Sequence, residues 1–276
     1  MMKNIKEEFD NNGFALGEKV ISDEQCDALC AEVEYLVENR KSLPEDKRPV
    51  SISSLGGMEK PVWQIVDIFM ASEKFTDLVH LPEITKVVAE LAGAKELRLW
   101  HDQIQYKPAE TGGQNFWHQD WPYWGILDRP SQVTAWIALD DAAEDNGCMS
   151  MVKGSHKWGD QIMELHSWQK GEGTPFFDIP KEFEHGKIEQ ALCEVPKGHA
   201  HFHHGLTWHG SHANKSGRPR RAIALHYMTE ETLYDDTGNH LMKKYIEVKH
   251  GEKICGDTFP LVYADSKPVS KVMASV

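Results

Sequence analysis

The chain has 276 residues, of which 40% are apolar and 26% charged, and this composition is typical of a globular protein with one large core. Its formal net charge of −13 argues against a nucleic acid or an anionic membrane surface as a partner. The sequence has neither an N-terminal apolar leader nor an apolar run of about 18 residues, and its five cysteines form no CxxC motif, so we expect a cytoplasmic protein.

The first part of the chain, about residues 1–95, is expected to be helical. Ser22-Asp23-Glu24-Gln25 has the pattern of a capping box and predicts the start of a helix. Apolar residues then follow at helical spacing: Cys26, Leu29, Cys30, Val33, Leu36 and Val37. Residues 41–60 predict a loop that could cover a site. Two short helices are expected at residues 72–80 and from Pro82 to Leu91, the second ended by Gly93.

From Leu97 onward the apolar period changes to two, which indicates strands. Leu97, Leu99, His101, Gln103 and Gln105 are expected to share one face of a strand, and strand-like runs recur at 133–139, 192–195, 200–204 and 221–228. This order predicts one domain over residues 1–276, mainly β with flanking helices (α+β), built as a double-stranded β-helix of the cupin-like jelly-roll type. Its parts would be a β core at 96–230, an insertion at 159–190 and a C-terminal extension at 231–276.

The pair His118 and Asp120 suggests a metal site. Alone it is weak, because the chain has 15 histidines. Farther along, however, His209 is followed by Gly-Ser and then by Arg220. Two imidazoles and one carboxylate form the facial triad of non-haem Fe(II) oxygenases, and an arginine can hold a carboxylate of an oxo-acid bidentately. Because residues two apart in a strand point to the same side, we expect His118 and Asp120 to reach one metal ion.

Two further segments complete the pattern: Asp145-Asn146-Gly147-Cys148-Met149 followed by Lys153-Gly154-Ser155-His156-Lys157, and Gln103 to Pro108 before the His-x-Asp pair. Together these motifs resemble the phytanoyl-CoA hydroxylase-like family of Fe(II)/2-oxoglutarate dioxygenases, over about residues 63–228. One departure is Lys153, which stands where the family usually has proline.

The resemblance implies that His118, Asp120 and His209 bind Fe(II) and that Arg220 binds the distal carboxylate of 2-oxoglutarate. It also implies that Trp136, Ser211 and Gln103 line the co-substrate site, with Gln64 as a looser match. The implied reaction uses O2 and hydroxylates an unactivated C–H bond, with release of succinate and CO2. Because Asp120 is present, hydroxylation is favoured over halogenation.

Several alternatives remain at this point. Other histidines crowd the region of His209, namely His199, His201, His203, His204 and His212, and a His-rich tract could instead bind zinc or nickel. Alternation places His201 and His203 on one strand face. Arg220 and Arg221 are adjacent and point to opposite sides, so Arg221 is the alternative anchor. The chain could also be a metal-dependent cupin enzyme that does not use 2-oxoglutarate, or a binding barrel without turnover.

The expected substrate is a small organic molecule, such as an amine, an amino-acid derivative or a secondary metabolite, rather than an acyl-CoA. Aromatic and amide side chains that could form its pocket, in addition to the 159–190 insertion, are Trp63, Trp100, Gln105, Trp117, Trp121, Tyr123 and Trp124. We expect a monomer or a weak homo-oligomer, with neither a nucleic acid nor a membrane as partner.

Overall fold

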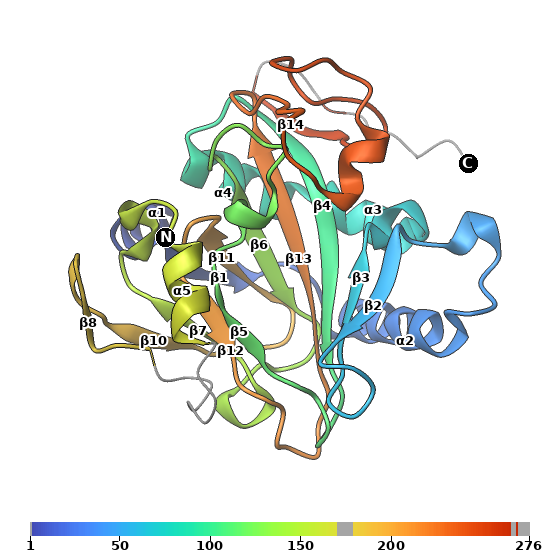
Figure 1. Ribbon diagram of the computed structural model, residues 1–276. Helices are drawn as coiled ribbons and strands as arrows, with labels where there is room; N and C mark the ends of the chain where they lie inside the picture. The colour runs from blue at the N-terminus through green and yellow to red at the C-terminus, as the bar shows by residue number, and fades with distance from the viewer. Residues whose placement is uncertain (1, 170–178, 266–268, 270–276) are drawn as a thin grey trace.

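The computed structural model describes residues 2–169, 179–265 and 269, and its main strands form two antiparallel sheets (Figure 1). The larger sheet contains, in spatial order, β1 (Phe14–Lys19), β11 (His199–His204), β6 (Val133–Ala138), β13 (Arg220–Thr229), β4 (Glu96–Lys107), β3 (Val62–Val66) and β2 (Ser51–Leu55), with β14 (Leu261–Ala264) also paired to β4. The smaller sheet contains β10 (Gln190–Cys193), β7 (Met149–Val152), β12 (His209–Ser211) and β5 (Asn115–His118). A separate hairpin joins β8 (Glu182–Phe183) to β9 (Gly186–Lys187).

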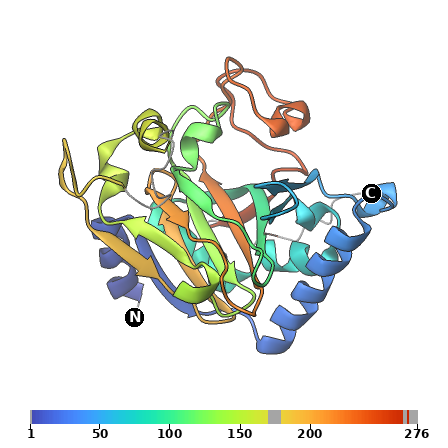
Figure 2. The same ribbon diagram turned by 60° about the horizontal axis from the view of Figure 1, so that its bottom comes forward.

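The chain alternates between the two sheets. It passes from β4 in the larger sheet to β5 in the smaller one, returns to β6, crosses again to β7, and repeats this exchange through β11, β12 and β13. Apolar side chains from both sheets meet between them, among them Trp136 and Ala224 from the larger sheet and Met151 from the smaller. Figure 2 shows the backbone of the two sheets from a second direction. The predicted jelly-roll class is therefore confirmed, although the strands of the described residues do not close into a barrel.

Helices from the first hundred residues cover the outer face of the larger sheet, whereas the last α-helix contacts the smaller sheet. The α-helices are α1 (Met2–Asn12), α2 (Asp23–Asn39), α3 (Glu73–Val79), α4 (Pro82–Ala92) and α5 (Ile162–Trp168). Short 3-10 helices are η1 (Glu45–Lys47), η2 (Ile68–Met70), η3 (Trp121–Tyr123), η4 (Glu144–Asn146), η5 (Ser155–Trp158) and η6 (Leu241–Tyr245). Side chains of α2, α3 and α4 share one core with outward-facing strand residues such as Ile137, Phe202 and Ile223. Alternate residues of the same strands thus face the space between the sheets.

The predicted helices in this layer are confirmed. Ser22 accepts a hydrogen bond from the backbone of Gln25, whose side chain accepts one in return from the backbone of Ser22, so the capping box is complete. The buried residues of α2 are the six predicted ones. Helix α4 has Pro82 at its first position and ends at Gly93, whose φ of 64° is a left-handed conformation that glycine adopts without strain.

Three expectations about the first hundred residues need correction. Residues 1–95 also contribute the strands β1, β2 and β3. Residues 51–55, expected in a loop, form the edge strand β2 paired to β3. In β4, the pairing with β13 skips Trp100, so a bulge reverses the side-chain parity there. As a result, Leu97 and Leu99 face the helices, whereas His101 contacts Trp124 and His226 on the other side.

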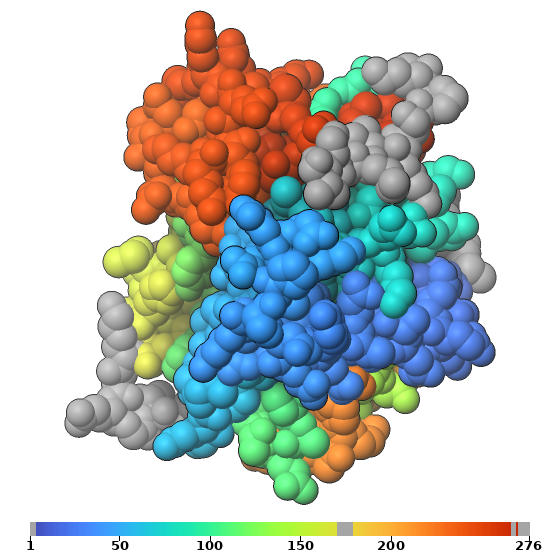
Figure 3. All heavy atoms as spheres, turned by 90° about the vertical axis from the view of Figure 1, so that its right-hand side faces the viewer, coloured from blue at the N-terminus to red at the C-terminus, as the bar shows by residue number. Residues whose placement is uncertain are grey.

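The C-terminal residues 231–265 cover one end of the larger sheet. Tyr234, Met242, Ile254 and Phe259 join a core with Trp100 and Trp124. Figure 3 shows these residues, in orange and red, above the light-blue segment that includes β2. Residues 231–265 thus close one end of the space between the sheets, next to the histidines described below. Among the described helices, none combines the length and apolar character that a membrane crossing requires.

Candidate active site

His118 and His209 lie side by side on neighbouring strands. His118 is the last residue of β5, His209 is the first of β12, and the two are direct cross-strand partners with ring centroids 4.1 Å apart. Nδ1 of His118 lies 2.7 Å from the carbonyl oxygen of Phe116, and Nδ1 of His209 lies 2.9 Å from that of Thr207. Each Nδ1–H therefore donates to a carbonyl oxygen, which leaves the Nε2 lone pair of each ring available to a metal ion.

Asp120 reaches the two imidazoles through a turn. Strand β5 ends at His118, and Asp120 has the right-handed helical angles φ −75° and ψ −50° at the start of η3. Its backbone N–H donates to the carbonyl oxygen of Gly205 over 3.0 Å. His118 and Asp120 do face one point, as expected, but strand alternation is not the cause. The turn and the contact with Gly205 orient the carboxylate.

The three side chains surround a common gap. Oδ1 of Asp120 is 3.6 Å from Nε2 of His118 and 3.6 Å from Nε2 of His209, and the three candidate ligand atoms lie within 4.8 Å of one another. A separation of 3.6 Å is too long for a hydrogen bond, so the three groups face a shared point rather than each other. Two nitrogen donors and one carboxylate oxygen on one side of that point fit an Fe(II) ion.

The second oxygen of Asp120 is held by the larger sheet. Oδ2 of Asp120 lies 3.2 Å from Nε2 of His203 and 3.5 Å from the hydroxyl of Thr134, which in turn contacts Nδ1 of His226 at 2.8 Å. Burial by itself would raise the pKa of Asp120, but the nearby His209, His203 and His226 outweigh it and hold this pKa well below its usual value. The carboxylate is therefore charged at neutral pH.

The ligand histidines are neutral at the same pH. Burial, and next the neighbouring His209, lowers the pKa of His118 to about 4. Burial also lowers the pKa of His209, against the opposing effect of Asp120. Neutral imidazoles with free lone pairs are the form that binds a metal.

Arg220 lies in the space between the sheets, and Arg221 lies outside it. The Arg220 guanidinium donates to the carbonyl oxygens of Gly147 and Gln105 over 3.0 and 3.3 Å, and it stacks on Trp136 with 5.5 Å to the ring centroid. Its Nε is buried without a hydrogen-bond partner, and burial lowers the pKa of Arg220 to about 10. Arg221 instead pairs with Asp140 at 2.7 Å and with Glu34 at 2.6 Å. Of the two arginines, Arg220 is the one placed to receive a buried anion.

The other residues expected near the co-substrate face the same space. Trp136 lies between the sheets against Arg220. The Ser211 hydroxyl accepts a hydrogen bond from Lys107 over 2.6 Å. Gln103 is the cross-strand partner of Ala224, whose side chain belongs to the core between the sheets, and Gln64 is paired to Gln105. Parity therefore places Gln103 and Gln105 on this inner face.

The expected substrate pocket is only partly correct. Trp63 belongs to the core under the helices and stacks on Arg40, and Trp117 is buried on the outer side of the smaller sheet with Trp208. Neither reaches the metal site. Tyr123 does lie near it, with its ring 6.2 Å from that of His118 and its hydroxyl 2.8 Å from Nε2 of His166 on α5.

The remaining candidates fall into three groups. Trp100, Trp121 and Trp124 belong to or contact the core closed by the C-terminal segment. Gln105 accepts a hydrogen bond from Asn115 over 3.2 Å on the inner face. Of the 159–190 insertion, helix α5 contacts β5, whereas residues 170–178 lie outside the described part of the chain.

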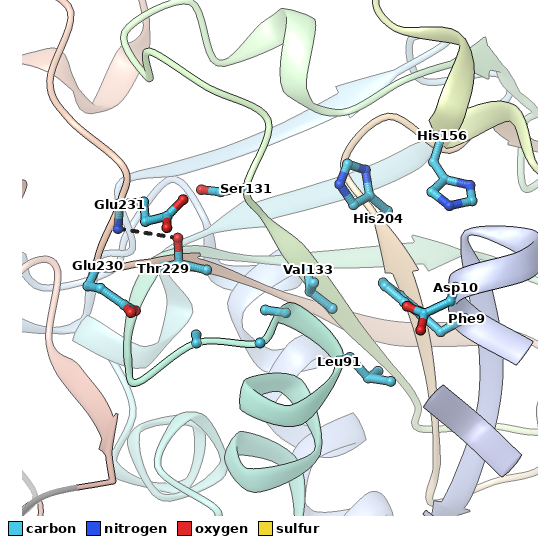
Figure 4. Close-up of a pocket in the computed structure, with 13 residues that line it drawn as sticks. Phe9, Asp10, Leu91, Ser131, Val133, His156, His204, Thr229, Glu230 and Glu231 are labelled. Carbon is cyan, nitrogen blue, oxygen red and sulfur yellow. Dashed lines mark hydrogen bonds between the residues drawn. The ribbon is translucent and has the colours of Figure 1, made fainter. Parts of the chain in front are cut away.

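A surface pocket with a volume of about 250 Å³ lies elsewhere, between α1, α4 and the ends of β6 and β13 (Figure 4). Its lining includes Asp10, His156, His204 and Glu231. His204 follows His203 on β11, so its side chain points away from Asp120. This pocket is therefore separate from the candidate metal site.

Thr134, His226 and Lys107 are polar residues of the site that the sequence did not single out. Thr134 faces inward from β6, whose other inward residues are apolar, and His226 faces inward from β13 beyond Ala222 and Ala224. No local pattern in the sequence marks either residue. Lys107 could have been identified from the sequence. It lies two residues after Gln105 on the same strand, so alternation places its side chain on the same inner face as those of Gln103 and Gln105. The structure buries Lys107 completely, directly opposite Arg220.

Comparisons with known proteins agree with this geometry. The family model described as phytanoyl-CoA dioxygenase (PhyH) matches residues 9–222. The human peroxisomal phytanoyl-CoA dioxygenase is 27% identical over 208 residues, which are 73% of this chain and 60% of that protein. The ectoine dioxygenase of Nocardia farcinica is 30% identical over 152 residues, which cover 54% of this chain and 49% of that protein.

A solved structure shows the same fold at low identity. The epimerase SnoN from nogalamycin biosynthesis, in complex with Fe3+, alpha ketoglutarate and nogalamycin RO, has a TM-score of 0.73 at 22% identity, covering 95% of this chain and 98% of its own. The family match spans most of the chain, including the triad and Arg220. The chain therefore belongs to the phytanoyl-CoA dioxygenase family, which consists of Fe(II)- and 2-oxoglutarate-dependent oxygenases.

Proposed function

We propose that this protein is an Fe(II)- and 2-oxoglutarate-dependent dioxygenase that hydroxylates a C–H bond of a small organic molecule, with release of succinate and CO2. The observation that carries the proposal is the convergence of His118, Asp120 and His209 on one point, within 4.8 Å of one another. The buried and incompletely bonded Arg220 faces the same space between the sheets.

In this proposal His118, Asp120 and His209 hold Fe(II) from one side. The bound iron supplies the activation of O2, coupled to decarboxylation of 2-oxoglutarate. The Nδ1 hydrogen bonds to Phe116 and Thr207 fix the orientation of the two imidazoles, and His203 and Thr134 fix that of the carboxylate. These contacts leave the opposite side of the metal point free of protein ligands among the described residues.

Arg220 binds the distal carboxylate of 2-oxoglutarate through its free guanidinium edge, and Trp136 holds the guanidinium plane by stacking. The apolar side chains between the sheets, such as Met151 and Ala224, exclude water from this end of the site. The co-substrate is thereby held in one orientation, with its oxo-acid end directed toward the triad.

The substrate of this protein is proposed to be small and partly polar, such as an amine, an amino-acid derivative or a secondary metabolite. Tyr123, His166, Gln105 and Asn115 supply hydroxyl, imidazole and amide groups near the triad. The two cations named in the site, Arg220 and Lys107, are buried between the sheets. They are therefore not placed to bind the phosphates of a CoA chain at the surface.

The experiment that tests this function is succinate formation from 2-oxoglutarate in the presence of Fe(II), ascorbate and O2, without and with a panel of small metabolites. A substrate should stimulate succinate release, and hydroxylated product should form in equal amount. If turnover of 2-oxoglutarate is absent, or if Arg220→Leu leaves it unchanged, the protein uses its metal for a different reaction.

We also propose a cytoplasmic location and a monomer or weak homo-oligomer. The five cysteines are all free, and four of them are buried, which suits a reducing compartment. Sedimentation of the purified protein and microscopy of a tagged protein test these two proposals.

A further inference from the structure

Two buried cations lie directly opposite each other between the sheets. Arg220 on β13 and Lys107 on β4 are cross-strand partners, and both side chains are buried. Like charges in this arrangement repel, and an unpaired buried charge is costly. Among the described residues, neither Lys107 nor Arg220 has a carboxylate within ion-pair distance, because the nearby Asp140 is committed to Arg221. The described residues therefore supply no carboxylate to offset either basic group.

Gly147 brings these two cations together. Its carbonyl oxygen accepts from the Arg220 guanidinium, and its φ of +82° is left-handed. A Cβ at this position would lie 2.4 Å from the carbonyl oxygen of His212 and 3.4 Å from Cδ of Lys107. Only a residue without a side chain lets the turn pack this closely against Lys107 and the end of β12.

Lys107 determines how the Ser211 hydroxyl is oriented. Its ammonium group donates to the Ser211 hydroxyl over 2.6 Å, to the carbonyl oxygen of Ser211 over 3.3 Å and to that of His212. Because the Ser211 oxygen accepts from Lys107, its own hydrogen must point to another acceptor. The structure shows no such acceptor among the described residues. Burial, and next the charge of Arg220, holds the pKa of Lys107 well below its usual value.

We propose that Lys107 is a positioning residue of the site for the distal carboxylate of the oxo-acid, and that it acts through the Ser211 hydroxyl. This inference rests on the proposed function. The carboxylate accepts from Arg220 on one side and from Ser211 on the other, and its charge relieves the repulsion between the two cations. Lys107 thereby contributes to the affinity that the oxo-acid gains from its distal carboxylate.

The test compares two oxo-acids that differ in that carboxylate. The full chain is loaded with Mn(II), and the binding of 2-oxoglutarate and of pyruvate is measured by isothermal titration calorimetry. Lys107→Met keeps the length of the side chain and removes its charge. Lys215→Met is the matched control, since Lys215 is exposed in the connection between β12 and β13. Ser211→Ala removes only the hydroxyl and leaves the backbone acceptors of Lys107 in place.

Lys107→Met is expected to weaken 2-oxoglutarate binding about 10-fold or more, the usual effect of losing a hydrogen bond that involves a charge, and to leave pyruvate binding unchanged. Ser211→Ala should have a similar effect. The double variant should lose little more than either single variant, because both act on the same hydroxyl. Lys107→Arg should recover part of the affinity, and Lys215→Met should match the wild type for both acids.

A purely structural Lys107 gives a different result. It would lower the melting temperature and weaken both acids by the same factor, leaving their affinity ratio unchanged, and this outcome overturns the inference. Additive effects of Lys107→Met and Ser211→Ala also overturn it. If Lys107→Met does not fold, Lys107→Gln takes its place, and the ratio of the two affinities is read in the same way. If Ser211→Ala weakens 2-oxoglutarate binding and Lys107→Met does not, the inference alone is contradicted. A wild-type protein that binds 2-oxoglutarate no more tightly than pyruvate, or that binds neither acid, contradicts the proposed function as well.

Discussion

His118 and His209 are direct cross-strand partners in the smaller sheet, and the Nδ1 of each contacts the carbonyl oxygen of the residue two positions before it. The two histidines therefore have the same local hydrogen-bond geometry on neighbouring strands. The register between β5 and β12 sets their separation, and a slip of one residue would turn one imidazole to the other face of the sheet.

Replacement of any one triad residue should abolish turnover. We expect His118→Ala, Asp120→Ala and His209→Ala to lose succinate formation and to bind Fe(II) much more weakly, because each removes one of three ligands. Far-ultraviolet circular dichroism should remain that of the wild type. His199→Ala is the control, because it changes a histidine at the other end of β11 from the metal site. Full activity of any triad variant at limiting Fe(II) would remove that residue from the ligand set.

His203 should control metal affinity without being a ligand. It contacts the Asp120 oxygen that faces away from the metal point, and loss of such a contact typically costs 10- to 100-fold in metal affinity or activity, so we expect roughly that loss for His203→Ala. His204→Ala, on the opposite face of the same strand, should leave metal affinity close to that of the wild type. Mn(II) titration followed by electron paramagnetic resonance measures both. Equal effects of the two changes would show that His203 acts only through the packing of β11.

Substitution of the two adjacent arginines should have different effects, one on co-substrate binding and the other on stability. Arg220→Leu is expected to raise the KM for 2-oxoglutarate by the equivalent of roughly 2–5 kcal/mol, because it removes a desolvated partner of the carboxylate. Arg221→Leu should leave this KM nearly unchanged. It should instead lower the free energy of unfolding by about 1–3 kcal/mol, because Asp140 loses its partner. Steady-state kinetics and urea unfolding distinguish the two, and the reverse order would place Arg221 in the site.

Stability should fall as the pH drops below about 6.5, the ordinary pKa of histidine. Burial lowers the pKa of His201 to about 3 and those of His118, His204, His226 and His240 to about 4. Between pH 6.5 and 4 the unfolded chain therefore takes up protons that the folded chain does not, which favours unfolding. Burial raises the pKa of Asp102 to about 7 and also raises that of Asp67, so these two carboxyl groups act in the opposite direction over this range and offset part of the loss.

Urea unfolding at pH 7.0 and pH 5.5, without added metal, measures this dependence. His201→Gln should make the loss of stability on acidification smaller, by up to about 1.4 kcal/mol per pH unit for the one proton removed. His199→Gln, at a half-buried position where β11 begins, serves as the control. A protein that is equally stable at both pH values would show that the buried histidines are already protonated in the folded state.

The sequence by itself determined the features that depend on neighbours along the chain. The capping box at Ser22 and the helical spacing after it predicted both the start and the buried face of α2, and Pro82 and Gly93 predicted the limits of α4. Strand alternation predicted that only one of Arg220 and Arg221 faces inward. These signals are local, because hydrogen bonds within a turn and the period of burial are set by residues a few positions apart.

Only the tertiary structure decided how distant segments meet. The register of β5 against β12, the contact of Asp120 with Gly205, and the bulge at Trp100 that reverses the faces of β4 all depend on pairing across the fold. The same pairing turned Trp63 and Trp117 away from the metal site and placed Lys107 opposite Arg220. No periodicity records such contacts, because the pattern of one strand is compatible with several partners and registers, and packing between sheets selects one of them.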